Sequence, residues 1–200
     1  MGIDVNGVFE KQDGERWVYV GEFDDGQRGF LRFWLGWGSG WYSRYGIAPI
    51  AGASRGLPAE LLGCADGTYW IDPEYRINTK RAALVGEQQH SWLSGEEILA
   101  ALPVTGMRRH LVPSDTANRL MACDADLNQW AAEISGEHQW GEVPRLVAVS
   151  ARPEAIAAED PDGMPVDCTW DFSEYIAHFT DEVRRQTALH GRIRFVYGFS

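Results

Sequence analysis

Three polar residues in separate parts of the chain have the chemistry that a small hydrolase or phosphodiesterase needs. They are Asp4, His90 and Arg55, and Arg55, next to Gly56 in a loop, could clamp an anionic group. If the fold brings all three into one cleft, such an enzyme is the alternative function. Each also has a structural interpretation: an ion pair across two strands for Asp4, capping or loop bonds for His90, and bonds to loop carbonyls for Arg55.

The sequence has no familiar phosphate-binding or metal-binding motif. It contains no glycine-rich phosphate loop, and its five histidines do not have metal-ligand spacing. Cys64, Cys123 and Cys168 are far apart and form no C-x-x-C pair. We therefore expect reduced, partly buried thiols, no metal, no cofactor, and a binding function rather than catalysis.

The segment GFLRFWLGWGSGWYSRYG, residues 29–46, holds seven aromatic residues and five glycines. Phe30, Phe33, Trp34 and Trp37 have the i, i+3, i+4, i+7 spacing of the buried face of a short helix. The glycines favour turns after that helix, and rings that the core does not need could grip a planar ligand or a protein partner. The residues that we expect at this binding site are Trp37, Trp41, Tyr42, Tyr45, Arg55, Asp4, Asn6 and His90.

The charge of the chain limits the classes of partner. The formal net charge is −11, and residues 61–170 carry seventeen Asp or Glu against eight Arg or Lys. Direct nucleic-acid binding needs clustered cations and is not expected. An acidic flank suits a protein with a basic surface, including one that handles nucleic acid. Because sixteen of the eighteen basic residues are Arg, a nucleotide-like small molecule is the other candidate partner.

The sequence predicts elements that would position these residues. Alternation over residues 3–10 and 17–20 around Asp13-Gly14 indicates an opening hairpin, and residues 26–36 read as helical. Ser94 and Glu97 have capping-box spacing before a helix over 95–102. We also expect a long helix over 115–134 with Ser114 as its N-cap, a strand over 145–150, an exposed loop over 152–167, an amphipathic helix over 171–190 and a last strand over 192–199.

These elements predict an α+β fold, a single domain with a small, largely antiparallel sheet covered by helices and a possible variable insertion at about 103–168. If the last strand pairs with the first, Arg192 or Arg194 could lie beside Asp4. No segment has the length and apolar character of a membrane span, and the start of the chain is unlike a secretory signal, so we expect a cytoplasmic protein without membrane contact.

Several short strings are similar to those of an uncharacterised family of small proteins from tailed phages and prophages. They are the start MGIDV, RGLP at 55–58, HSWL at 90–93 before an EEIL helix, and the terminal RIRFVYGF. The chain departs from the family pattern at Ile3 and Asn6, where the family has Cys and His. The resemblance implies a phage protein that acts in the host cytosol and antagonises host defence, by blocking a basic, nucleic-acid-handling host protein or by sequestering a nucleotide-like signal.

Overall fold

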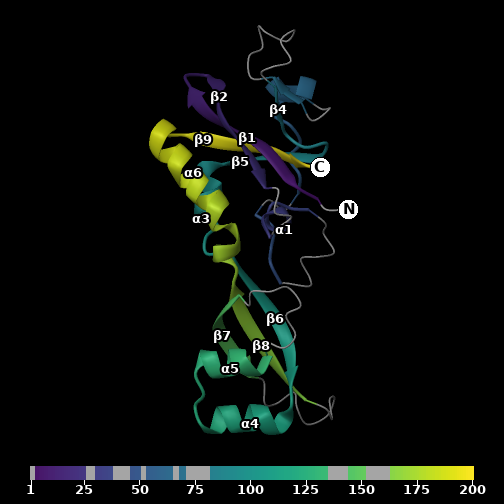
Figure 1. Ribbon diagram of the computed structural model, residues 1–200, viewed down its shortest axis with the longest axis vertical. Helices are drawn as coiled ribbons and strands as arrows, with labels where there is room; N and C mark the ends of the chain where they lie inside the picture. The colour runs from purple at the N-terminus through teal and green to yellow at the C-terminus, as the bar shows by residue number, and fades with distance from the viewer. Residues whose placement is uncertain are drawn as a thin grey trace. The chain divides into compact units, whose positions relative to one another are not determined.

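The computed structural model describes residues 3–25, 30–37, 46–50, 53–64, 68–70, 82–134, 144–151 and 163–200. It divides into two compact units, which we describe separately. Unit 1 comprises residues 1–42, 48–102 and 175–200, and unit 2 comprises residues 43–47 and 103–174. The predicted α+β class is confirmed, because all strand pairs of the described residues are antiparallel and helices pack on the sheets (Figure 1).

A four-stranded sheet of order β2-β1-β9-β5 forms the centre of unit 1. The predicted opening hairpin is confirmed as β1 (Val5–Asp13) and β2 (Arg16–Asp25), joined at Gly14, whose φ of 61° favours glycine. The last strand, β9 (Ile193–Phe199), lies between β1 and β5 (Gln88–Ser94). All seven residues of β9 are buried, because both faces of the sheet are covered.

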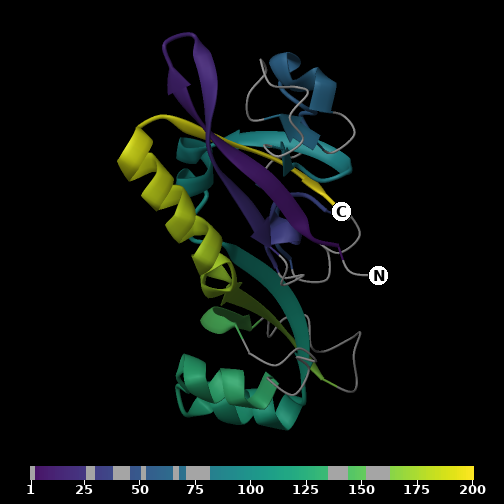
Figure 2. The ribbon, with the colours of Figure 1, turned by 45° about the horizontal axis from the view of Figure 1, so that its top comes forward.

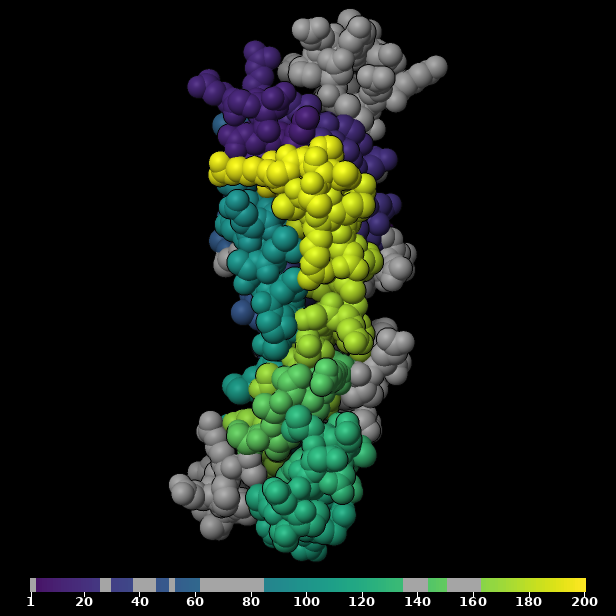
Figure 3. All heavy atoms as spheres, turned by 90° about the vertical axis from the view of Figure 1, so that its left-hand side faces the viewer, coloured from purple at the N-terminus to yellow at the C-terminus, as the bar shows by residue number. Residues whose placement is uncertain are grey.

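One face of this sheet packs against helices through aromatic rings. Phe179 of α6 (Ala177–His190) lies 5.0 Å from Phe195 of β9 and stacks on Phe9 of β1, with ring centroids 6.3 Å apart. The short α3 (Gly95–Ala100) packs beside α6 (Figures 1, 2 and 3). Its predicted capping box is present, since Ser94 and Glu97 exchange both expected hydrogen bonds. A short helix η6 (Ser173–Ile176) precedes α6.

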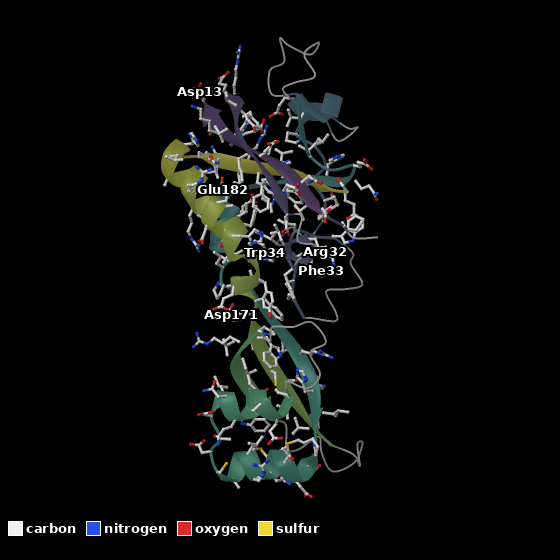
Figure 4. All side chains as sticks on the ribbon, viewed as in Figure 1. Asp13, Arg32, Phe33, Trp34, Asp171 and Glu182 are labelled. Carbon is white, nitrogen blue, oxygen red and sulfur yellow. The ribbon has the colours of Figure 1, made fainter. Side chains whose placement is uncertain are left out.

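The described part of the aromatic segment belongs to this core. The helix predicted over residues 26–36 is only one turn, α1 (Leu31–Trp34), in which Phe33 and Trp34 are buried (Figure 4). The carbonyl of Leu35, just after α1, accepts a 2.9 Å hydrogen bond from the Tyr197 hydroxyl on β9. The core interpretation of this helix is therefore confirmed for its two central rings.

A short helical segment, η1 (Ala59–Cys64), lies on the opposite face of the sheet. There Leu57 and Leu61 pack on Val8 and Val196. A two-stranded ladder, β3 (Thr68–Trp70) with β4 (Ala82–Leu84), completes the described strands of unit 1.

Unit 2 is built on a second antiparallel sheet, of order β6-β8-β7. Its strands are β6 (Thr105–Val112), β7 (Arg145–Ala151) and β8 (Met164–Asp171). One face is buried: the Trp170 indole donates a 3.3 Å hydrogen bond to His110 Nε2 on that side. The helix α5 (Leu127–Ile134) packs on β6 and β7 through buried Trp130 and Ile134, next to α4 (Ser114–Ala122).

Three predictions in this region are wrong. The single helix expected over 115–134 is broken between α4 and α5, because Asp124 takes a left-handed φ of 50° and Asp126 caps a new helix. The Asp126 carboxylate accepts hydrogen bonds from the backbone N–H groups of Asn128 and Gln129, so Asp126 and not Ser114 is the capping side chain here. Part of the loop expected over 152–167 is strand β8, and residues 152–162 lie outside the described residues.

Candidate functional site

Four of the predicted site residues lie where β9 ends in unit 1. Asp4 exchanges backbone hydrogen bonds of 2.9 and 3.2 Å with Ser200, just after β9. Asn6 pairs with Gly198 in the β1–β9 register, and the His90 ring lies against the same glycine from β5. Trp37 packs on Phe199 with ring centroids 5.1 Å apart. The end of one strand therefore gathers residues separated by almost the whole sequence.

Asn6 has a structural role at this end of the sheet. Its side chain is buried, donates a 3.1 Å hydrogen bond to Asp24 and accepts one of 2.9 Å from the Ser200 hydroxyl. These two bonds tie the start of β1 to the end of β2 and to the residue after β9. A ligand would have to displace them to reach the amide, which favours a structural function for Asn6.

Asp4 does not have the arginine partner that the sequence suggested. The last strand does pair with the first, but the antiparallel register places Arg194 beside Glu10 and Arg192 beside Gln12. Asp4 lies at the other end of this strand pair, so the expected ion pair is wrong. The physical reason is the strand register, which cannot be predicted from the sequence until the residues that face the core are known.

His90 is held by the backbone around it. Its Nε2 donates a 2.8 Å hydrogen bond to the carbonyl of Gly86, and its own carbonyl accepts a bond from the Ser54 hydroxyl. Gly198 leaves the space that the ring occupies, since a Cβ there would lie 2.8 Å from His90 Cδ2. This ring joins the turn before β5 to the central strand, so the loop-bonding interpretation of His90 has direct geometric support.

Arg55 is engaged by a carboxylate and an aromatic ring. Its two terminal nitrogens donate hydrogen bonds of 3.1 and 2.6 Å to the two carboxylate oxygens of Glu97, and the guanidinium lies 5.0 Å from the ring centre of Trp92. The Arg55 hydrogen bond lowers the pKa of Glu97 to about 2. The Arg55 backbone N–H also bonds to Ser91, which places it near β5. Arg55 thus fastens the loop before η1 to the sheet, an arrangement that leaves it less suited to gripping an anion.

The remaining predicted ligand-binding rings, Trp41, Tyr42 and Tyr45, lie outside the described residues. Trp37, the one ring of that set with a described position, is half-buried against Phe199. For the enzyme hypothesis, the guanidinium of Arg55 and the imidazole of His90 bind Glu97 and Gly86 respectively, while the Asp4 backbone pairs with Ser200. Each of the three thus has its own structural partner, which weakens the idea of a shared catalytic cleft.

Cysteine chemistry is not favoured in unit 2. Burial, and secondarily the charge of Asp167, raises the pKa of the Cys168 thiol to about 12, so it stays protonated near neutral pH. Cys123 is exposed at the end of α4. Among the described residues, no group of three or more His, Cys, Asp and Glu is placed to hold a metal ion.

A second candidate surface lies in unit 2, at residues that the motifs of the sequence did not indicate. In the described part of the chain, seven large apolar side chains are exposed, and five of them belong to this unit: Met107, Leu111, Met121, Leu127 and Val147. Met107 and Leu111 are 62% and 54% exposed and project from β6 on the face opposite the buried one. Exposed apolar residues on a charged surface, such as this pair on β6, are typical of protein-binding surfaces.

Residues 103–174 also carry most of the net negative charge of the chain, with thirteen Asp or Glu against five Arg. The alternation of β6, in which Gly106, His110 and Val112 are buried between exposed neighbours, was the available signal for this face. The exposed positions Met107 and Leu111 break the usual rule that the outer face of a strand is polar.

Comparison of the chain with protein-family models, with curated proteins and with solved structures finds no match. In the described ranges, no helix has the length and apolar character needed to cross a lipid bilayer.

Proposed function

We propose that this protein is a binding protein that attaches through unit 2 to a partner protein with a basic, nucleic-acid-handling surface and blocks that surface. The observation that carries the proposal is the coincidence in one unit of five exposed large apolar side chains with thirteen acidic and five basic residues. Apolar contact would supply affinity, and the opposite charges would speed and orient the encounter.

Of the two target classes that the sequence suggested, the protein has the stronger support. A nucleotide-like ligand would need a ring platform and a cation for its phosphate. Arg55 is already paired with both carboxylate oxygens of Glu97, and Trp37 is packed on Phe199. An anionic ligand would also meet a chain of net charge −11.

The resemblance to phage and prophage proteins supports a bacterial host protein as the partner and the host cytosol as the place where the two meet. A protein that antagonises host defence by occupying a nucleic-acid-binding surface needs no catalytic group. It needs an acidic surface with an apolar anchor, and unit 2 combines an acidic composition with exposed apolar side chains.

The test is competitive capture. The full chain is immobilised, exposed to a bacterial lysate at about 0.15 M salt, and eluted first with duplex DNA and then with about 1 M salt, at which the screening length falls from about 8 to about 3 Å. We expect a retained protein that is basic and that DNA releases, and a Met107→Ser/Leu111→Ser variant that retains much less of it. Retention of nothing, or of proteins that neither DNA nor salt releases, would contradict the proposal.

A further inference from the structure

The outer face of the unit 2 sheet presents three side chains in a row along β6. Met107, Arg109 and Leu111 are exposed and alternate with the half-buried Arg108 and the buried His110, so all three project from the same side of the strand. They are exposed, with 62% of Met107, 54% of Leu111 and 54% of the Arg109 side chain accessible. Alternate residues of a strand are about 7 Å apart, so the row is long enough to contact one bulky side chain of a partner and the residues on either side of it.

The middle member of the row is held in a fixed orientation. Arg109 donates hydrogen bonds of 2.7 Å from Nε and 3.0 Å from Nη2 to the two carboxylate oxygens of Asp167, its cross-strand neighbour on β8. Asp167 is itself 7% exposed. A bidentate pair of this kind fixes the plane of the guanidinium and removes much of the ordering cost that a free arginine would pay on binding.

This arrangement is suited to a planar apolar group and not to an anion. Asp167 already neutralises Arg109, so a phosphate or carboxylate would gain little there. An aromatic ring can lie over a guanidinium plane, contact a methionine sulfur and pack on a leucine side chain at the same time. Met107, Arg109 and Leu111 offer these three kinds of contact side by side.

We propose that the Met107–Arg109–Leu111 row receives an exposed aromatic side chain that is flanked by lysine or arginine on the partner protein. This inference rests on the proposed function, which supplies the basic partner. The acidic excess of residues 103–174, thirteen Asp or Glu against five Arg, is the complement of the flanking cations. A second copy of the chain fits this role less well, because it would bring the same excess of negative charge.

The test uses two peptides that differ in one residue, the acetylated amides Lys-Lys-Trp-Lys-Lys and Lys-Lys-Ala-Lys-Lys, titrated into the isotope-labelled full chain by NMR. We expect the Trp peptide to bind at least about two- to fivefold more tightly than the Ala peptide, the range of one exposed cation–π contact. It should shift the methyl signals of Met107 and Leu111 upfield, as a ring stacked over them would.

Variants separate the row from the general charge. Arg109→Lys keeps the charge and the Asp167 ion pair but loses the planar group, and it should reduce the preference for Trp. Leu111→Ser should weaken the Trp peptide severalfold, whereas Leu189→Ser, at a leucine 62% exposed in unit 1, is the matched control and should change nothing.

The outcomes also distinguish this inference from the proposed function. Equal binding of both peptides, with shifts elsewhere in unit 2, would overturn the aromatic site while leaving a basic partner supported. Binding of neither peptide would count against both. Shifts of Met107 and Leu111 that depend on protein concentration without peptide would show a second copy on this face and overturn the inference.

Discussion

Removing the buried cation of unit 1 should be among the most damaging single changes to this protein. Arg194 on β9 donates a 2.5 Å hydrogen bond to Glu10 and one of 2.7 Å to Glu60, and it lies 4.4 Å from the ring centre of Trp17. The side chains of Arg194 and Glu10 are 5% and 1% exposed, whereas that of Glu60 is 52% exposed. The two carboxylates therefore differ greatly in how much they need the arginine.

Arg194→Met leaves the Glu10 carboxylate buried without this partner, a change that costs about 3–5 kcal/mol in comparable sites. For a chain of this size each kcal/mol lowers the melting temperature by about 2–4 °C, so a fall of about 6–20 °C is expected. Glu60→Gln breaks only an exposed contact and should cost less than about 1 kcal/mol. The double variant Glu10→Leu/Arg194→Met should recover most of the lost stability, since no charge is then stranded.

Two assays test this prediction. Urea unfolding measures the change in stability, and hydrogen exchange reports the two units separately. Amides of β1 and β9 should lose protection in Arg194→Met, while those of β8 should keep it. The reasoning is refuted if Arg194→Met lies within about 0.5 kcal/mol of the wild type, or if the double variant is as unstable as the single one.

Three further predictions concern positions with a single clear physical role. Gly86→Ala should destabilise unit 1 by several kcal/mol in urea unfolding, because φ there is +73° and a Cβ would lie 2.2 Å from a backbone carbon of β9. Gly14→Ala is the control, since φ is +61° but nothing lies within 4 Å, and it should cost only about 1–2 kcal/mol. Equal losses of stability in the two variants would contradict the predicted steric clash at Gly86. Arg55→Ala should raise the pKa of Glu97 from about 2 toward 4.5 in an NMR titration. Because the folded pKa is lowered, this pair adds stability above the unfolded pKa that is lost as pH falls toward 2, and an unchanged pH dependence in the variant would argue against the pairing. Asp126→Ala should cost about 1 kcal/mol and fray the start of α5, and unaltered amide protection there would show that its cap is dispensable.

Local signals in the sequence predicted the elements that depend on local physics. The hairpin at Gly14 follows from alternation around a turn dipeptide, and the start of α3 follows from the capping box of Ser94 and Glu97. The start of α5 was available in the same way, because Asp126 and Gln129 also have capping spacing and the Gln129 side chain accepts a bond from the Asp126 N–H. Because the apolar periodicity continues across this capping signal, the sequence predicted one helix where the structure has two.

The candidate sites depended on long-range pairing, which the sequence does not fix. Arg109 and Asp167 are 58 residues apart, and only the β6–β8 register makes them neighbours. The register of β1 and β9 likewise moved the arginines away from Asp4 to the far end of the strands. For the same reason, residues chosen for their chemistry, such as His90 and Arg55, proved to have structural partners that no sequence spacing indicated.

The most direct test of the central claim, that unit 2 is the binding surface, is hydrogen exchange of the full chain with and without the protein captured from lysate. The account predicts new protection at the amides of residues 105–112 in β6, with the exchange of β1, β2 and β9 unchanged. Protection confined to those strands of unit 1, with β6 exchanging as in the free protein, would contradict it.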